Sequence, residues 1–252
     1  MAGERYAADA ALRGYRERRD DDGGCVLVLE LSHGTAELEL VDDGVLRLRA
    51  WAQEEPLRPE LALERGHWRA HAGSARERDG GISWQSTSCP LRVEVDATPL
   101  RIRLLDRRGA PLAELGELAF ADSGAARIGF HCRNDDRFFG FGEKTGPLDK
   151  RGARLAMRNR DPESLEYADP LYVSIPFFLA LREGGVALGL LLECFAASHF
   201  DVAAAHPGRV TIEASAGGLD LAVFPGPSPR EVLERFSARG RGKRFGCQVK
   251  TR

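Results

Sequence analysis

Apolar and polar residues alternate along much of the chain with a period of two. Leu46, Leu48 and Ala50 alternate with Arg47 and Arg49, and the segments 91–96 and 100–104 follow the same rule. A strand of an antiparallel sheet shows this alternation when one face packs on a core and the other meets water. The pattern therefore predicts antiparallel strands with the arginines on the solvent face.

Turn-forming residues separate the alternating runs at short intervals. Asp42-Asp43-Gly44 is typical of a hairpin turn, and Gly- or Pro-containing turns also occur at 98–99, 107–109, 183–185 and 217–218. About a dozen or more strands fit between Cys25 and Phe224 by these signals, and no segment there shows a helical period. We predict an all-β fold, a large antiparallel β-sandwich, in preference to an α/β fold.

Two segments, Tyr172–Leu181 and Val186–Cys194, are almost continuously apolar. Such runs indicate strands that are covered on both faces, so we predict a hairpin in the interior of the sandwich. Pro176 has no N–H to donate to a neighbouring strand. A bulge or a local edge is therefore expected at this position.

A helix start follows the last predicted strand. Ser228 supplies a capping hydroxyl, Pro229 suits the first helical position, and Glu231 follows the cap by three residues. The apolar residues Val232, Leu233 and Phe236 then recur at helical spacing.

The change of pattern divides the chain into three parts: an N-terminal segment 1–24, a sandwich 25–226, and a linker helix with a tail, 227–252. The last part resembles the start of a further domain. Because the apolar stripe of the helix would face that domain, we expect the helix to be held only loosely in this chain.

Composition limits the classes of partner. The 252 residues are 43% hydrophobic and 29% charged, with a net charge of -2, which indicates neither nucleic acid nor an anionic membrane as a partner. No apolar run is long enough to cross a bilayer, and the first residues lack a secretory core, so a cytoplasmic location is expected. The five cysteines form no CxxC pair, and we expect no disulfide, metal site or cofactor.

The most specific motif lies between Phe138 and Phe178. The chain reads FFGFGEKTGPLDKRG and then RNRDPESLEYADPLYVSIPFF, and the helix start at 226–232 reads GPSPREV. This resembles the N-terminal sandwich of glycoside hydrolase family 31, which carries F-[FY]-G-x-G-E-[KR]-x-G-x-L-x-[KR]-R-G, an N-x-D loop and a D-P-L-Y-x-S-I-P-F strand. The resemblance implies a galactose-mutarotase-like sandwich that precedes a (β/α)8 catalytic barrel in an α-glucosidase-like enzyme.

The segment between Arg158 and Pro170 is long for a connection between strands, and long ordered loops are often functional. Its carboxylates and arginines suit the hydroxyls of a sugar, and the ring of Tyr167 suits an apolar sugar face. In the family, the aspartate of the N-x-D loop reaches the mouth of the active site on the barrel. The resemblance implies this role for Asp161, with Arg160 beside it. We expect Asn159, Arg160, Asp161 and Tyr167 to bind an α-linked oligosaccharide or α-glycoside in the complete enzyme.

A simpler explanation of the same loop is a solvated charged surface, with Asp161 capping the turn before Pro162. Gly140 and Gly142 allow either a structural bulge or a close backbone approach. They do not form a dinucleotide fingerprint, because no third glycine follows in register.

The chain offers no catalytic residues for glycoside hydrolysis. Retaining glycosidases need two carboxylates, and family 31 carries its nucleophile on the barrel in a motif similar to W-x-D-M-N-E. None of the three tryptophans of this chain begins such a motif. We therefore expect a non-catalytic domain whose parent is a retaining α-glycosidase.

Two other functions are weighed against this one. An independent carbohydrate-binding module would present exposed aromatic residues as a platform. An aldose epimerase would use an acid–base pair such as His131 and Glu143. His67 and His71 are spaced like metal ligands, but Trp68 stands where the HExxH motif needs Glu.

Overall fold

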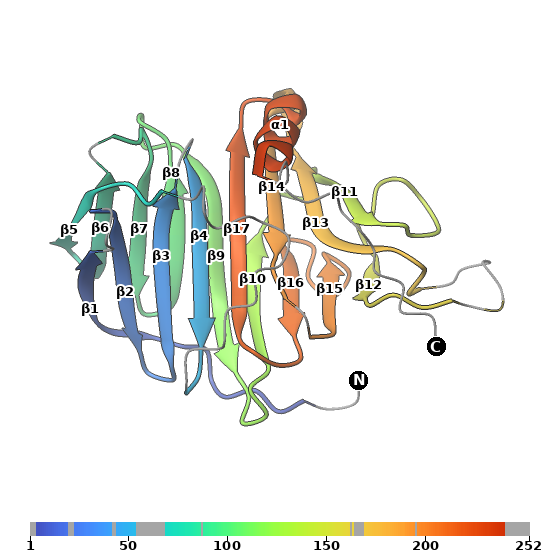
Figure 1. The fold of residues 1–252 in the computed structure, drawn as a ribbon, viewed down its shortest axis with the longest axis horizontal. Coiled ribbons are helices and arrows are strands. Elements are labelled where there is room, and N and C mark those ends of the chain that lie inside the picture. The colour runs from blue at the N-terminus through green and yellow to red at the C-terminus, as the bar shows by residue number, and fades with distance from the viewer. Residues whose placement is uncertain are drawn as a thin grey trace.

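The computed structural model describes residues 4–19, 23–41, 44–53, 69–86, 88–161, 163, 169–194 and 196–239. Within these ranges, two antiparallel sheets stack face to face, and one α-helix lies against the outer face of one sheet (Figure 1). Apolar side chains fill the space between the sheets. The predicted β-sandwich with one helix is therefore confirmed.

The first sheet has eight strands among the described residues, in the order β1-β2-β3-β4-β17-β14-β13-β11. Their bounds are β1 (Leu12–Arg19), β2 (Cys25–Leu31), β3 (Thr35–Val41), β4 (Val45–Trp51), β11 (Arg137–Gly142), β13 (Ser174–Leu181), β14 (Ala187–Leu192) and β17 (Leu219–Gly226). β1 lies in the segment 1–24 that the sequence pattern separates from the sandwich. It pairs with β2 from Leu12 to Arg19, so the sheet begins before Cys25.

The second sheet has nine strands in the described part of the chain, in the order β12-β15-β16-β10-β9-β8-β7-β6-β5. Their bounds are β5 (Gly73–Arg78), β6 (Gly81–Ser86), β7 (Arg92–Ala97), β8 (Leu100–Leu105), β9 (Pro111–Phe120), β10 (Ala126–His131), β12 (Arg154–Met157), β15 (Ser198–Val202) and β16 (Arg209–Ala214). Consecutive hairpins build most of this sheet, as the regularly spaced turn signals predict.

Aromatic rings fill the core beside the β11 and β13 strands. Phe178 contacts three other rings, with centroid distances of 5.8 Å to Phe130, 5.8 Å to Phe138 and 5.3 Å to Phe141. All four side chains are fully buried. Each such burial contributes about 1.5–3 kcal/mol, so the end of the sandwich that carries β11 is firmly packed.

The predicted apolar hairpin is confirmed as β13 and β14, which pair in antiparallel register from Phe177–Leu191 to Leu181–Ala187. The bulge expected near Pro176 is also present. β11 pairs with β13 at Gly140–Phe178 and next at Gly142–Ser174, so β13 contains extra residues there, and Pro176 is one of them. The missing N–H of Pro176 therefore falls outside the regular ladder.

The helix α1 (Pro229–Arg239) begins where the sequence predicts. The Ser228 hydroxyl donates to Oε2 of Glu231 at 2.7 Å and accepts from the Glu231 N–H at 3.4 Å. The second contact satisfies one of the backbone N–H groups at the open end of the helix.

The expectation that the apolar stripe of α1 lacks a neighbour is wrong. Val232 is fully buried against the eight-stranded sheet, and the ring of Phe236 stacks on Phe177 with centroids 4.1 Å apart. Leu233, in contrast, is 47% exposed. Apolar residues on the outer face of β13, β14 and β17 hold the helix, so it is part of the sandwich.

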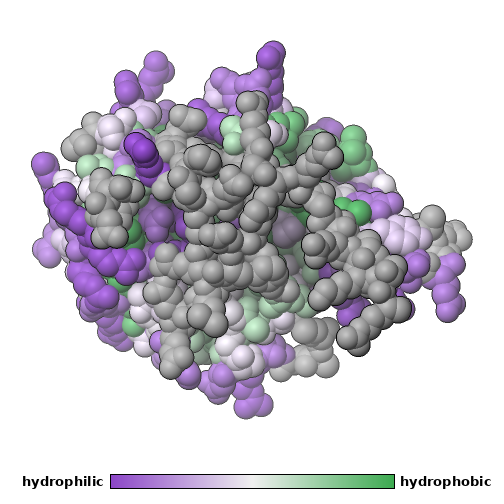
Figure 2. Space-filling model, viewed as in Figure 1, coloured by the Kyte–Doolittle hydropathy of each residue, from purple (hydrophilic) through white to green (hydrophobic). Residues whose placement is uncertain are grey.

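The expectation that Arg47 and Arg49 meet water is also wrong, because both side chains are buried on the outer face of β4. Arg47 donates from Nε and Nη2 to Asp220 of β17 at 2.9 and 2.5 Å, and Arg49 pairs with Glu37 and Glu39 of β3. Burial opposes the charge of Arg47, but the hydrogen bond and charge of Asp220 outweigh this and raise its pKa. Figure 2 shows other hydrophilic side chains crowding the left of this face, where β1 and β2 lie.

Candidate functional site

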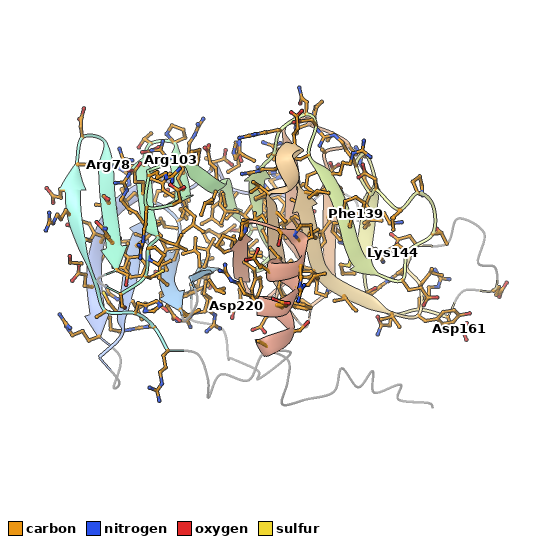
Figure 3. All side chains as sticks on the ribbon, turned by 90° about the horizontal axis from the view of Figure 1, so that it is seen from above. Arg78, Arg103, Phe139, Lys144, Asp161 and Asp220 are labelled. Atoms are coloured by element: carbon orange, nitrogen blue, oxygen red, sulfur yellow. The ribbon has the colours of Figure 1, made fainter. Side chains whose placement is uncertain are left out.

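The predicted substrate loop connects β12 of one sheet with β13 of the other. β12 is the edge strand of the nine-stranded sheet, and β11, which pairs with β13, is the edge strand of the eight-stranded sheet. The loop therefore emerges where the edges of both sheets meet. Figure 3 shows Lys144 and Asp161 at this same end of the molecule, far from Arg78 and Arg103.

Hydrogen bonds join the two ends of this loop. Oδ1 of Asn159 accepts from the backbone N–H of Ser174 at 2.8 Å, and the Ser174 hydroxyl donates to the carbonyl of Arg158 at 3.0 Å. The N–H of Arg160 donates to the carbonyl of Leu171 at 2.9 Å. The side-chain oxygen of Asn159, a predicted substrate-binding residue, thus helps to close the loop.

An ion pair between a buried lysine and a more exposed aspartate holds the same stem from the side. Nζ of Lys144 lies 2.7 Å from Oδ1 of Asp169 and donates to the carbonyl of Ala156 at 2.6 Å. Oδ2 of Asp169 accepts from the N–H of Ala156 at 2.7 Å. The Lys144 side chain is only 1% exposed. We call these three residues the clasp.

A second buried lysine supports the segment that carries Lys144. Nζ of Lys150 donates to the carbonyls of Thr145 at 2.9 Å and of Lys144 at 3.4 Å. Burial and the neighbouring charge of Lys144 lower the pKa of Lys150. The connection between β11 and β12 is therefore fixed from within, although its surface residue Leu148 is 80% exposed.

The predicted residues Arg160 and Asp161 are both exposed at the start of the loop. The charge of Asp161 acts on the phenol of Tyr172, which lies near the other end of the loop and is 41% exposed. Partial desolvation and the charge of Asp161 raise the pKa of the Tyr172 phenol. A carboxylate and an aromatic ring therefore stand side by side at this surface. Tyr167 lies outside the described residues.

Sequence reasoning missed Tyr172 and Lys144 as members of this site, although both belong to the matched motif. The motif placed Tyr172 in a strand and left Lys144 without a role. β13 begins only at Ser174, so Tyr172 belongs to the loop instead.

The acid–base pair considered for an aldose epimerase does not form as expected. Nε2 of His131 lies 3.1 Å from Oε2 of Glu117, and Nη1 of Arg209 lies 3.6 Å from Oε1 of the same carboxylate. Glu143, in contrast, follows β11, where its N–H donates to the carbonyl of Val173. His131 thus lies in a polar cluster with Glu117 and Arg209 across β9, β10 and β16.

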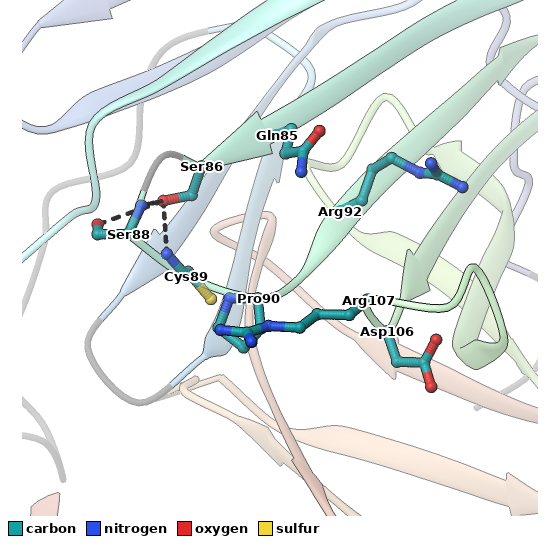
Figure 4. Close-up of a pocket in the computed structure, with 8 residues that line it drawn as sticks. All are labelled: Gln85, Ser86, Ser88, Cys89, Pro90, Arg92, Asp106 and Arg107. Atoms are coloured by element: carbon teal, nitrogen blue, oxygen red, sulfur yellow. Dashed lines mark hydrogen bonds between the residues drawn. The ribbon is translucent and has the colours of Figure 1, made fainter.

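The aromatic platform of a carbohydrate-binding module is not seen among the described tryptophans. Trp84 is fully buried and Trp51 is 9% exposed. A polar pocket of about 370 Å³ lies beside β6 and β7, lined by side chains that include Gln85, Arg92 and Arg107 (Figure 4). Its other polar groups are partly engaged, since the Ser86 hydroxyl accepts from the N–H groups of Ser88 and Cys89.

The helix found in the described residues is too short to cross a membrane. Among the same residues, no three His, Cys, Asp or Glu side chains gather in a way that would hold a metal ion.

Known proteins resemble this chain in sequence. Residues 35–201 match the model of the glycosyl hydrolase 31 N-terminal galactose mutarotase-like domain. Alpha-glucosidase 2 of Bacillus thermoamyloliquefaciens is 36% identical over 156 residues, which are 60% of this chain and 19% of that protein. Lysosomal alpha-glucosidase of Mus musculus is 35% identical over 99 residues, 38% of this chain and 10% of that protein. The chain thus spans a small part of its curated relatives.

Solved structures share the fold over nearly the whole chain. A GH31 dextranase of Flavobacterium johnsoniae, in complex with isomaltotriose, superposes with a TM-score of 0.77 at 23% identity, covering 93% of this chain and 28% of the dextranase. A cycloalternan-forming enzyme of Listeria monocytogenes, in complex with a pentasaccharide substrate, gives 0.71 at 15% identity, covering 93% and 22%.

Proposed function

Because the chain belongs to the family of glycosyl hydrolase 31 N-terminal galactose mutarotase-like domains, we propose that it supports the (β/α)8 catalytic barrel of an α-glycosidase and lends that barrel one substrate-contacting loop. The observation that carries this proposal is the exposed pair of Asp161 and Tyr172 on a loop whose stem is fixed. The domain itself is non-catalytic, and the chemistry belongs to carboxylates on the barrel.

The proposed substrate is an α-linked oligosaccharide or α-glycoside. Two exposed groups, Arg160 and Asp161, offer a donor and an acceptor for neighbouring sugar hydroxyls, and the ring of Tyr172 offers an apolar surface for a sugar face. Leu148 and Val173 are exposed apolar residues on the two connections at this end. We propose that they contact the barrel.

The test is Asp161→Ala in the complete enzyme that contains this domain. Loss of a charge-assisted hydrogen bond costs about 1.5–3 kcal/mol, so kcat/KM for an α-glucoside should fall by about one to two orders of magnitude. The melting temperature should barely move, because Asp161 is exposed. The exposed Glu183, in the turn between β13 and β14, provides the matched control Glu183→Ala. Normal kinetics with a lowered melting temperature would instead support a turn-capping role.

We propose a cytoplasmic location. The support is the state of the cysteines: Cys25, Cys89, Cys132 and Cys194 are free thiols, and burial raises the pKa of each. A reducing compartment keeps such thiols unpaired. Alkylation of the denatured, unreduced protein from its native source should label all five cysteines. A pair of cysteines that labels only after reduction would argue against this location.

A further inference from the structure

The clasp of Lys144, Ala156 and Asp169 joins the two ends of the substrate loop at its base. Ala156 lies on β12 before the loop, and Asp169 lies at the loop's other end. The carboxylate of Asp169 accepts from the N–H of Ala156 on one oxygen and from Nζ of Lys144 on the other, and Nζ of Lys144 also donates to the carbonyl of Ala156. The N–H of Ala156 is therefore bound directly to the far end of the loop, and its carbonyl is bound to that end through Lys144.

An ion pair with a buried cation is a costly way to hold a loop if stability is the sole purpose. Removing the ammonium of Lys144 from water costs several kcal/mol, and an apolar residue of similar size is often at least as stabilising. Apolar contacts, however, allow the two ends to slide, whereas the directional hydrogen bonds of a carboxylate and an ammonium allow one alignment. The chemistry of the clasp suits accurate placement of the loop.

Other contacts connect the clasp with the exposed residues of the loop. The stem continues outward through the Asn159–Ser174 and Arg160–Leu171 hydrogen bonds. Asp161 directly follows Arg160, whose N–H makes the last of these bonds. A shift of Asp169 relative to Ala156 would therefore move Asp161 as well.

We propose that Lys144 and Asp169 are positioning residues, which set the location of Asp161 relative to the substrate. This inference rests on the proposed function of the Asp161 loop. A misplacement of about 1 Å at a reacting site costs about 100-fold in rate, so loss of the clasp should lower kcat/KM by about 10- to 100-fold.

The decisive experiment is a double-mutant cycle in the complete enzyme, with Lys144→Met, Asp161→Ala and the combined variant. If Lys144 acts through Asp161, the combined variant is no slower than Asp161→Ala alone. A purely structural role for Lys144 predicts instead that the two losses multiply, and that result would overturn the proposal. Arg154→Met is the control, because it removes a cation of β12 whose partner is Asp201 and whose side chain is 74% exposed.

Amide hydrogen exchange on the 252-residue chain separates this inference from the proposed function. Lys144→Met and the isosteric Asp169→Asn should each speed exchange at Arg160 and Ser174 by at least tenfold and leave the amides of β10 and β16 unchanged. Unchanged exchange at Arg160 and Ser174 would overturn the clasp even if Asp161→Ala impairs the enzyme. Faster exchange there, with no effect of Asp161→Ala on kinetics, would leave the clasp in place and refute the substrate role that the proposal gives it.

Discussion

Two glycines of the sheet, Gly189 and Gly226, leave room for the side chain of Val232. A β-carbon on Gly189 would lie 2.7 Å from Cγ1 of Val232 and 2.9 Å from the Phe177 ring, and one on Gly226 would lie 2.6 Å from Cγ2 of Val232. Contacts this short are repulsive, so α1 approaches the sheet closely because these positions carry no side chain.

Gly189→Ala should therefore destabilise the chain by overpacking, by about 1–3 kcal/mol in the free energy of unfolding. Urea denaturation measures this change. Gly208→Ala is the control, because its nearest neighbour, the carbonyl oxygen of Cys132, lies 3.7 Å away. Adding Val232→Ala should recover part of the loss. Equal stability of Gly189→Ala and Gly208→Ala would show that the packing between α1 and the sheet tolerates a methyl group.

At the candidate site, the sequence motif names residues but does not state how their side chains pair. The order of matched residues identified the loop and Asp161, and the structure adds Lys144, Asp169 and Tyr172 to it. These partners lie far apart along the chain, and no local pattern states which side chain meets which. Their pairing follows from the meeting of two sheet edges, a property of the assembled fold.

Among the elements, the strands followed the period of two closely, and the helix followed its capping residues. The sequence pattern did not reveal which residues cover a given face of a strand or of the helix. Alternation places Arg47 and Arg49 opposite the core, but it does not reveal that carboxylates of β3 and β17 enclose them. Likewise, the stripe of α1 shows an apolar face without showing which surface receives it. β1 was missed because Leu12–Arg19 is mostly exposed and charged.

The link between β4 and β17 should depend on both members of the Arg47–Asp220 pair. Arg47→Met leaves Asp220 with its side chain only 19% exposed and without its main cation, so we expect a loss of about 3 kcal/mol in the free energy of unfolding. Combining Arg47→Met with Asp220→Leu should restore much of this loss. Chemical denaturation of both variants tests the pair. A double variant as unstable as the single one would show that the charge left unpaired is not the cause.

For the molecule as a whole, the N-terminal segment joins the two sheets. Ala7 and Ala10 donate to Phe120 and Leu118 of β9 in one sheet, and the chain then enters β1 of the other. The guanidinium of Arg127 lies 4.7 Å from the centre of the Tyr6 ring. Burial, followed by the charge of Glu213, raises the pKa of Tyr6 to about 12.

Because of this raised pKa, the folded chain should lose part of its stability at alkaline pH. The phenol keeps its proton in the folded chain up to about pH 12, whereas an unfolded chain loses it near 10. The folded state therefore binds more protons between these values, and its stability should fall as pH rises through that window. Tyr6→Phe should weaken this fall, measured as the urea midpoint at pH 9 and pH 11.5. An identical fall in the variant would assign the effect to other groups.

The position of β17 has a consequence for the order in which a newly made chain can fold. β17 is the last strand along the described chain, yet it lies between β4 and β14, and the Arg47–Asp220 hydrogen bonds join residues 173 positions apart. Until residues 219–226 leave the ribosome, β1–β4 and the group β14-β13-β11 remain separate pieces, each with an open edge. Open edges invite pairing with other chains. A nascent chain that stops before Leu219 should therefore aggregate, whereas one that includes β17 closes the sheet.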